Sequence, residues 1–130
     1  MASIFTKIIN GEIPCYKIAE NEHCIAFLDI APRTKGHTLV IPKKEVDQLF
    51  DLPEADYNEL IKFAKQVAIA IKSVVPCKRV GVAVIGLEVP HAHIHLIPLE
   101  NAEDMVFQKP HVPVSVEEMK DIARRISEVF

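Results

Sequence analysis

The sequence predicts a single α+β domain built on an antiparallel sheet, and three observations support this fold class. Short β-prone runs fill the first third of the chain. A long stripe of apolar residues at helical spacing then follows Glu54, and two further apolar runs precede a second amphipathic segment. The order strands, helix, strands, helix is typical of a sheet covered by helices rather than of alternating β and α units.

Composition narrows the class of protein. The chain has 130 residues, of which 49% are hydrophobic and 25% charged, enough to bury a core without disulfides. A formal net charge of -3 supplies no overall positive field, so we expect neither a nucleic acid nor a membrane as partner. Three widely spaced cysteines indicate reduced thiols and a cytoplasmic location. No signal peptide or membrane-spanning run of about 20 apolar residues is expected.

The N-terminal third is expected to contain one short helical segment and three strands. Apolar residues at helical spacing predict one or two turns that end at the turn dipeptide Asn10-Gly11. Two β-prone runs joined by a polar link have the pattern of a hairpin. A third run stops at Pro42, which cannot donate to a sheet ladder. These predicted strands cover residues 15–19, 24–30 and 37–41.

The middle of the chain predicts the main helix. The segment Asp51-Leu52-Pro53-Glu54 resembles a capped helix start, and Pro76 ends the apolar stripe that follows. Spacing at the 3.6-residue repeat places the stripe on one side of the helix. It consists of Leu60, Phe63, Ala64, Val67, Ile71, Val74 and Val75.

Two strands and a last helix complete the predicted fold. The almost wholly apolar run 80–85 predicts a central strand buried on both faces, and residues 91–97 predict its antiparallel neighbour. Ser115 with Glu118 forms a capping-box signature, so a C-terminal helix is expected to begin there. Its apolar residues are Val116, Met119, Ile122, Ala123, Ile126 and Val129.

The stretch VPHAHIHLIP at residues 89–98 places three of the six histidines within five residues. If it is a strand, alternation puts His91, His93 and His95 on one face and apolar residues on the other. A solvated sheet face without a role is one interpretation. A chemical role is favoured, because histidine has no special strand propensity and neighbouring imidazolium charges repel one another. The apolar face would contain Ala92, Ile94 and Leu96.

Two chemical roles fit three histidines in this register. As ligands of one zinc ion they would have to converge, although the first and third lie about 13 Å apart on an extended strand. The second role is nucleophilic catalysis, in which a neutral imidazole attacks an electrophile while its neighbours orient it and handle protons. A phosphate electrophile would suit His93 as central nucleophile, with flanking imidazoles donating hydrogen bonds to developing charge.

Four blocks of the sequence are similar to one known family. HAHIHLI matches the pattern His-apolar-His-apolar-His-apolar-apolar, and three further blocks precede it in the family's order. The chain therefore resembles the histidine-triad (HIT) family, in particular its Hint-like branch. The resemblance covers residues 3–99, and its other blocks are residues 4–14, 26–30 and 36–44.

The resemblance implies a HIT-like fold: a five-stranded antiparallel sheet with one long helix, a short N-terminal helix and a C-terminal helix. It divides the chain into a HIT domain, residues 1–108, and a C-terminal helical extension, residues 109–130, packed on the same domain. The implied assembly is a homodimer, and no cofactor is expected.

The resemblance also implies a reaction. It is cleavage of nucleoside, in particular adenosine, 5'-monophosphoramidates or related adenylates through a covalent nucleotidyl group on His93. His91 and His95 would orient this nucleophile and hydrogen-bond the phosphate and leaving group, and His37 would complete the constellation. Asp29 would accept the ribose hydroxyls of the purine nucleotide, although a strand-end turn is its alternative role. The implied base slot, with ordinary core as its alternative, consists of Phe5, Ile8, Phe27, Ile30 and Leu39.

Three departures from the family pattern have consequences. Ser3, Thr6 and Glu45 occupy the places where many relatives carry zinc-binding cysteines and a histidine, so we expect no metal. Ahead of the triad, Leu87 and Glu88 replace a Gln-Ser/Thr pair. Glu88 is therefore expected near the leaving group, where it would repel a phosphate or pair with a cationic amine. The C-terminal helix replaces a short tail, and its role stays open.

Three other functions remain open at this point. A dinucleoside polyphosphate hydrolase would use the same nucleophile. A catalytically weak nucleotide-binding or interaction module would explain the changed loop before the triad. A metal-dependent hydrolase would lose its activity to chelators. A covalent nucleotide on His93 separates the enzyme from the binding module.

Overall fold

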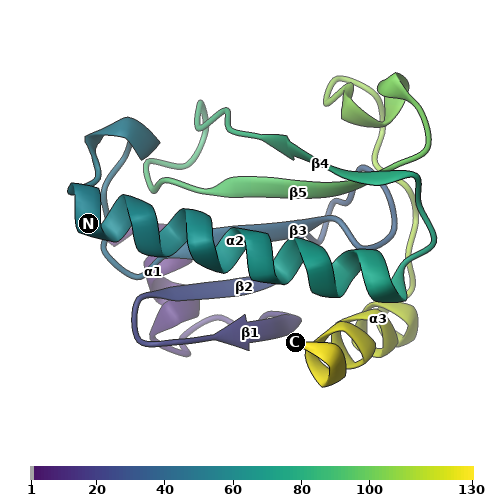
Figure 1. Cartoon of the computed structure of the whole chain (residues 1–130), viewed down its shortest axis with the longest axis horizontal. Helices are drawn as coiled ribbons and strands as arrows, with labels where there is room; N and C mark the ends of the chain where they lie inside the picture. The colour runs from purple at the N-terminus through teal and green to yellow at the C-terminus, as the bar shows by residue number, and fades with distance from the viewer. Residues whose placement is uncertain (1) are drawn as a thin grey trace.

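The computed structural model describes residues 2–130, in which five strands form one antiparallel sheet of order β1-β2-β3-β5-β4 (Figure 1). This confirms the predicted α+β class and the five-stranded sheet. The strands are β1 (Lys17–Glu20), β2 (Cys24–Leu28), β3 (Thr38–Pro42), β4 (Arg79–Ala83) and β5 (Ile94–Leu99). The helices are α1 (Ile4–Ile9), α2 (Glu54–Val74) and α3 (Val116–Val129), with 3-10 turns η1 (Leu49–Asp51) and η2 (Ala102–Met105).

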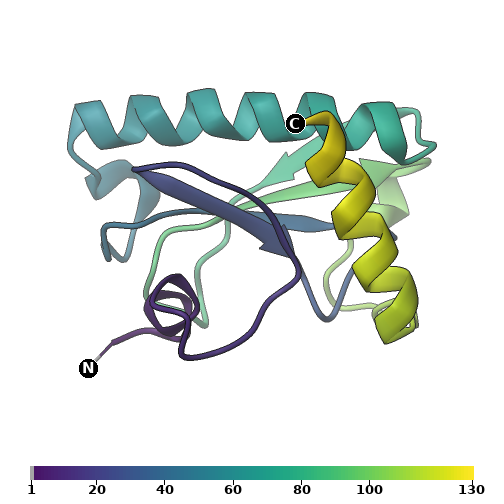
Figure 2. The same cartoon turned by 90° about the horizontal axis from the view of Figure 1, so that it is seen from below.

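Helices cover both faces of the sheet, with α2 on one side and α1 on the other (Figure 2). Because alternate residues of a strand point to opposite faces, β2 and β3 contribute to two cores. Ala26, Leu28 and Val40 belong to the larger core, which also contains the buried sides of α2 and α3. The smaller core, next to α1, consists of Phe5, Ile25, Phe27, Leu39 and Ile41.

The long helix is confirmed, but its predicted capped start is wrong. Pro53 holds the N-cap position of α2 without a side-chain hydrogen bond, and Asp51 ends η1 instead. Glu54 and Asp56 in the first turn favour the helix start, because their carboxylates lie near the positive end of the helix dipole. The buried side of α2 consists of Leu60, Phe63, Ala64, Val67, Ala70 and Ile71.

The prediction that residues 80–85 form a central strand buried on both faces is wrong. β4 is an edge strand that pairs with β5 on one side. Val82 keeps 63% of its surface exposed, and Ile85, just beyond the strand, keeps 45%. An apolar run has the same appearance whether its side chains are buried within one chain or left uncovered at a sheet edge.

The strand that carries the histidines is shorter than predicted. β5 begins at Ile94, so His95 lies within it, whereas His91 and His93 occupy the extended chain just before it. The ladder with β3 starts only at Ile94, and side-chain contacts fix the two preceding histidines. The predicted apolar face is confirmed as part of the larger core, with Ala92, Ile94 and Leu96.

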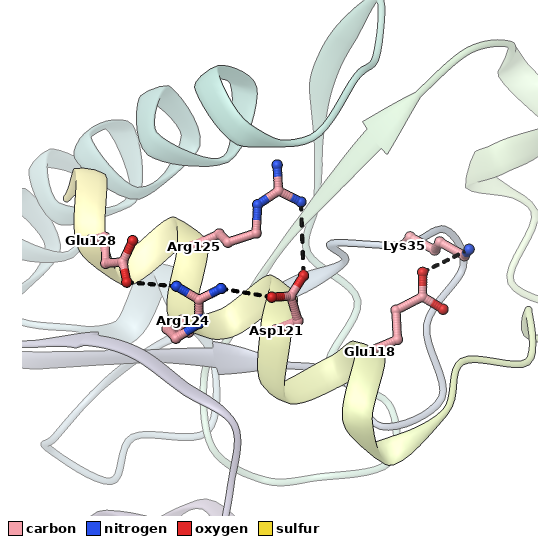
Figure 3. Close-up of polar contacts among 6 residues, drawn as sticks. All are labelled: Lys35, Glu118, Asp121, Arg124, Arg125 and Glu128. Carbon is pink, nitrogen blue, oxygen red and sulfur yellow. Dashed lines mark hydrogen bonds and ion pairs between the residues drawn. The ribbon is translucent and has the colours of Figure 1, made fainter.

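The C-terminal helix begins where the sequence predicts. Ser115 caps α3 by accepting a hydrogen bond from the backbone N–H of Glu118. On the exposed side, Arg124 forms ion pairs with Asp121 and Glu128 (Figure 3). The opposite side joins the larger core, so this helix shares its hydrophobic interior with α2. The residues that make this contact are Met119, Ile122, Ala123 and Ile126.

The cysteines are unpaired, as the sequence predicts. Cys15, Cys24 and Cys77 are all free thiols. Cys24 is buried in the larger core, and this burial raises the pKa of its thiol to about 11, which makes it a poor nucleophile. Among residues 2–130, no helix combines the length and apolar character needed to cross a membrane.

Candidate active site

The structure brings together the four histidines that the sequence singles out. All four are at least 92% buried, with exposed fractions of 1% for His37, 0% for His91, and 8% for His93 and His95. His37 directly precedes β3 rather than lying within it, and Gly36 before it adopts a φ of 93°, which favours glycine. The rings of His93 and His95 lie 5.1 Å apart, and those of His37 and His95 lie 5.2 Å apart.

Both ring nitrogens of His91 are held by hydrogen bonds. Nε2 lies 2.8 Å from the carbonyl oxygen of Pro42, and because a carbonyl only accepts, Nε2 carries the hydrogen. Nδ1 of the neutral ring then accepts from the hydroxyl of Ser3 at 2.8 Å. Burial lowers the pKa of His91, against the opposing effects of the Pro42 carbonyl and Glu45, so the ring is neutral near pH 7.

The ring of His93 is oriented by the backbone of His91. Its Nδ1 lies 2.8 Å from the carbonyl oxygen of His91, so Nδ1 carries the hydrogen and donates it. In the neutral form of the ring the lone pair is therefore on Nε2, which has no hydrogen-bond partner within residues 2–130. Phe5 of α1 meets this ring edge-on, with 5.0 Å between the ring centres. A neutral imidazole with a free nitrogen is a nucleophile.

A second chain of hydrogen bonds sets the tautomers of His37 and His95. The backbone N–H of Arg33 donates to Nδ1 of His37 at 2.9 Å, so the hydrogen of His37 is on Nε2. That Nε2 donates to Nδ1 of His95 at 2.9 Å, which leaves the hydrogen of His95 on its own Nε2. Burial is the main cause that lowers the pKa of His37 to about 3 and that of His95 to about 4.

The two hydrogen-bond chains give neighbouring rings opposite roles. His93 presents a lone pair, whereas His95 presents an N–H. A lone pair can attack an electrophilic phosphorus, and an N–H can stabilise negative charge that develops on the phosphoryl oxygens. The geometry therefore suits nucleophilic substitution at phosphorus better than proton transfer by one histidine alone.

Asp29 follows β2 and faces His37. Its Oδ1 accepts from the backbone N–H of Ala31 at 2.8 Å, which is the turn role that the sequence leaves open. Its Oδ2 lies 3.6 Å from Nε2 of His37. Burial raises the pKa of the Asp29 carboxyl, and the N–H of Ala31 opposes this effect. Oδ1 thus stabilises the turn after β2, while Oδ2 faces His37.

Four of the five apolar residues expected to line a base slot gather at α1. Phe5, Phe27 and Leu39 are buried in the smaller core, and Ile8 is half-buried against it. Ile30 is 79% exposed and lies outside this cluster. The three buried residues therefore have the core role that the sequence keeps as the alternative. Accessible apolar surface comes from Ile8 and Ile30.

Ser3, Thr6 and Glu45 meet at His91 as a hydrogen-bonded cluster. Oε1 of Glu45 accepts from the backbone N–H of Ser3 at 2.7 Å and from the hydroxyl of Thr6 at 2.6 Å. These two bonds, the Thr6 bond first, lower the pKa of Glu45 to about 2. Neutral hydroxyls do not replace the thiolates and imidazoles of a structural zinc site, so these residues do not fit the metal. The cluster instead joins α1 to the triad.

A second group of side chains is close enough to share a cation. The ligand atoms of Asp29, His37 and His95 lie within 4.8 Å of one another. Nε2 of His37 carries a hydrogen and donates it to Nδ1 of His95. Nε2 of His37 therefore has no lone pair for a metal ion, and the lone pair of Nδ1 of His95 is already used. A metal ion here would break the hydrogen bond that sets both tautomers.

The loop before the triad turns its side chains to solvent. Leu87 is 89% exposed, and Glu88 is exposed and lacks an ion-pair or hydrogen-bond partner within residues 2–130. Gly86 has a φ of 70°, which allows the turn. Water and salt screen a carboxylate in this position, so Glu88 repels a phosphate less strongly than the sequence suggests.

Two residues that sequence reasoning missed complete the site. Phe107 lies edge-on against His95, with 4.9 Å between ring centres, and Arg33 supplies the N–H that binds His37. Arg33 acts through its main chain, so no side-chain pattern could reveal this role. Phe107 is a single aromatic residue in a polar segment, and this isolated position is the only sequence feature, a weak one, that could have pointed to its role.

A groove on the surface lies beside the site rather than in it. It has a volume of about 860 Å³, and α3 and the segment before β1 form its walls. It includes Ile30 of the expected slot, but the four histidines do not line it. The groove therefore adjoins the expected nucleotide slot without containing any of the reactive groups.

Fold and site together define a protein with a histidine-triad centre on an antiparallel sheet. The HIT domain family matches residues 10–102. This match covers more than half of the chain, which therefore belongs to the HIT family.

Three relatives show how far the similarity extends. The adenosine 5'-monophosphoramidase of Schizosaccharomyces pombe is 38% identical over 130 residues, covering 98% of this chain and 97% of that protein. An uncharacterized HIT-like protein of Methanocaldococcus jannaschii is 46% identical over 105 residues, 73% of this chain and 77% of that protein. The crystal structure of a Hit-like protein involved in cell-cycle regulation from Bartonella henselae superposes with a TM-score of 0.84 at 30% identity, covering 98% and 96% of the two chains. The HIT-like fold thus extends over nearly the whole chain.

Proposed function

We propose that this protein cleaves nucleoside 5'-monophosphoramidates, with adenosine as the nucleoside, or related adenylates, through a covalent intermediate on His93. The observation that carries this proposal is the bond from Nδ1 of His93 to the carbonyl of His91, because it leaves the Nε2 lone pair for phosphorus. The similarity to the fission yeast monophosphoramidase, over almost the entire length of both chains, supports the choice of reaction within the Hint-like branch.

The reaction proceeds in two displacements. First, Nε2 of His93 forms a bond to the α-phosphorus while the bond from phosphorus to the amine nitrogen breaks. The leaving amine takes a proton from solvent, and the N–H of His95 stabilises the phosphoryl oxygens as charge develops. Water then attacks phosphorus, the bond to His93 breaks, and the nucleoside monophosphate departs. In sum, one water molecule is split: its hydroxyl ends on phosphorus and its hydrogen on the amine.

The nucleotide is held by groups around the histidines. Oδ2 of Asp29, which is not used by the turn, accepts the ribose hydroxyls. A purine base lies against the apolar surface that Ile8 and Ile30 leave accessible, with the buried phenyl group of Phe5 behind it. No residue in this arrangement requires a cofactor or metal, so the activity should persist in a chelator.

Two other functions use the same site. A dinucleoside polyphosphate hydrolase would attack phosphorus with the same His93 and differ only in the leaving group. A catalytically weak nucleotide-binding or interaction module is favoured by the loop before the triad, because the side chain of Leu87 has no hydrogen-bond donor for the phosphate. If the leaving group is a cationic amine, the exposed Glu88 can pair with it, and Glu88→Gln should then lower the preference for that amine.

We also propose that the protein is a cytoplasmic homodimer that pairs through β4. The edge of this strand is free for hydrogen bonding within residues 2–130, and apolar side chains beside it are exposed. Edge strands with uncovered apolar surface pair readily with a second chain. Three free thiols agree with a reducing compartment. The exposed apolar residues are Val82 in β4 and Val84 and Ile85 just beyond it.

Turnover of a synthetic phosphoramidate tests the proposed function. The substrate is adenosine 5'-monophosphate joined to an amine, and amine release is followed with and without a chelator for wild type, His93→Ala and the exposed control His23→Ala. We expect chelator-resistant release in wild type and the control, and a loss of at least about 10³-fold in His93→Ala. Rapid quenching and mass spectrometry should detect the nucleotidyl adduct on His93.

The outcomes separate the candidate functions. Release that is unchanged in His93→Ala would contradict the proposal. Binding of the nucleotide without release or adduct would indicate the binding module. Faster cleavage of diadenosine polyphosphates than of any phosphoramidate would indicate the dinucleoside polyphosphate hydrolase.

A further inference from the structure

The chain between η2 and α3 passes the histidine site. We call residues 106–112 the strap. In Figure 1 the chain after η2 runs across the end of the sheet toward α3. The backbone N–H of Val112 donates to the carbonyl of Pro32 at 3.0 Å, so the strap lies against the loop that leads into His37. Lys35 of this loop also forms an ion pair of 2.8 Å with Glu118 of α3 (Figure 3).

Arg33 fastens the strap. Its side chain is only 8% exposed, and its guanidinium donates to the carbonyl oxygens of Lys109 and Pro110. The Cζ atom lies 6.0 Å from the ring centre of Phe107, a cation–π distance. Nε of Arg33 is buried without a hydrogen-bond partner in the described residues, so burying this side chain carries a penalty. We call the Arg33 guanidinium, together with the two main-chain carbonyls and the Phe107 ring that it contacts, the clasp.

Phe107 lies between the Arg33 guanidinium and the catalytic rings. Its ring is edge-on to His95, with 4.9 Å between centres, and to His37, with 6.2 Å. On the other half of the site, Phe5 of α1 covers His91 at 5.8 Å and His93 at 5.0 Å. Each phenyl ring therefore covers one of the two hydrogen-bond chains.

We propose that Phe107, held by Arg33, is a positioning residue that keeps the His37 and His95 pair dry and its hydrogen bond intact. Water between Nε2 of His37 and Nδ1 of His95 would release His95 to the other tautomer, in which Nε2 is bare and cannot donate to a phosphoryl oxygen. The inference rests on the proposed function in one respect only: the phosphoryl oxygen that accepts the hydrogen bond from Nε2 of His95. It assigns a role at the site to the strap, in which Phe107 contacts the histidines and the carbonyls of Lys109 and Pro110, at the start of the C-terminal extension, hold Arg33.

The surroundings of the pair agree with this role. Burial is the largest cause of the lowered pKa values of His37 and His95, and an apolar ring contributes to burial from the strap side. The charged and titratable groups next to His37 and His95 are Asp29, Arg33 and His93. His111 of the strap lies near Asp29, where its charge favours the ionised carboxylate. Of these, Asp29 favours a charged His37, so burial has to outweigh it.

The test is an NMR titration of the histidine rings in the protein without nucleotide, which reports both tautomer and pKa. In Phe107→Ala the pKa of His95 should rise from about 4 to about 5 or higher, and its nitrogen shifts should show a mixture of tautomers. Phe107→Leu keeps an apolar cover and should stay near wild type. Gln108→Ala, at the exposed neighbouring position, is the matched control and should not change the titration.

Arg33 provides an independent check on the clasp. Arg33→Ala should shift the His95 titration in the same direction as Phe107→Ala, and the double variant should shift it no further, because both changes act through one contact. Unchanged His95 titration in Phe107→Ala, or an equal change in Gln108→Ala, would overturn the inference. Melting temperatures of all variants identify any that fail to fold, and Phe107→Leu keeps the test informative in that case.

Kinetics separate this inference from the proposed function. In Phe107→Ala, kcat for the phosphoramidate should fall about tenfold with little change in KM, and the acid limb of the pH profile should move to higher pH. A changed titration in a protein that never turns over phosphoramidates would uphold the role of the strap and contradict the proposed function. Full phosphoramidate turnover in Phe107→Ala with an unchanged His95 titration would support the proposed function and contradict the role of the strap.

Discussion

Nε2 of His37 lies 2.9 Å from Nδ1 of His95, and this contact joins the segment before β3 to the start of β5. The direction of the hydrogen bond is set one step earlier, by the backbone N–H of Arg33 on Nδ1 of His37. A main-chain donor is present whatever side chain occupies position 33. The loop conformation therefore places the hydrogen of His37 on Nε2, while the contact with His95 also depends on the side chains that surround the pair.

Replacing His37 tests this dependence. His37→Ala removes the donor to His95 and should lower kcat for phosphoramidate cleavage by about 10²-fold, the usual scale for loss of one positioned proton donor or acceptor. KM should change little, because His37 is 1% exposed. His37→Gln, whose amide can donate to His95, should recover part of the rate. Equal kcat values for wild type and His37→Ala, measured at steady state, would contradict the assignment.

The buried histidines predict that stability falls as the pH falls from 7 to 5. The pKa values of His37 and His95 are about 3 and about 4 in the folded protein, and near 6.5 in the unfolded chain. The unfolded chain thus binds more protons in this interval, and each histidine should lower the free energy of unfolding by about 2 kcal/mol at pH 5. The raised pKa of Asp29 has the opposite sign and offsets part of this loss.

Urea unfolding at pH 5, 6 and 7 measures this slope. His37→Phe should make the slope shallower, because one of the buried histidines no longer titrates, whereas the exposed His23→Gln should leave it as in wild type. The carboxyl of Glu45, with its pKa lowered to about 2, adds a further loss only below its unfolded value of about 4.5. A profile that is flat from pH 7 to 5 would show that these rings are accessible to protons.

Glu45 should matter through its hydrogen bonds rather than through its charge. Glu45→Ala removes the acceptor for Ser3 and Thr6, loosens α1, and should raise KM for the nucleotide about tenfold while lowering the melting temperature. In Glu45→Gln the side-chain oxygen can accept both bonds, so its KM should stay close to wild type. Glu22→Ala, an exposed carboxylate outside the site, is the control. A Glu45→Gln variant as impaired as Glu45→Ala would point to the charge instead.

The dimer proposal predicts a specific effect at β4. Val82→Lys places a charge on the exposed apolar surface of this edge strand and should convert a dimer into a monomer of 14.6 kDa, as measured by light scattering. Val116→Lys, on the exposed side of α3, should leave the mass unchanged. A wild-type protein that is monomeric at the concentrations of the assay would contradict the proposal.

Periodicity accounts for the parts of the fold that the sequence predicts correctly. The stripe from Leu60 to Ile71 requires a helix buried on one side, and the alternation of Ala92, Ile94 and Leu96 matches a sheet face in contact with that helix. This pattern does not indicate whether the apolar side chains of a strand are covered by other elements of the chain or left exposed. The apolar run around Val82 therefore looks the same at an edge as in the centre of a sheet.

The site follows the same division. Spacing alone singles out His91, His93 and His95, although two of them precede the strand and are held by Ser3, Pro42 and a main-chain carbonyl. Contacts of this kind depend on tertiary structure, because the groups are distant in sequence or lack a side-chain signal. The roles of Arg33 and Phe107 are of this second type, and only the folded chain reveals them.

The bonds that orient the histidines join distant parts of the polypeptide: 88 residues separate Ser3 from His91, 58 separate His37 from His95, and 76 separate Arg33 from Lys109. Contacts of such long sequence separation are the slowest to form, because large loops must close before they gain any stabilisation. During refolding from urea, the α2 helix should therefore regain its circular dichroism before the tautomers of the triad are set. Catalytic competence would then return with the slowest phase, and enzyme activity would report complete refolding of both ends of the chain.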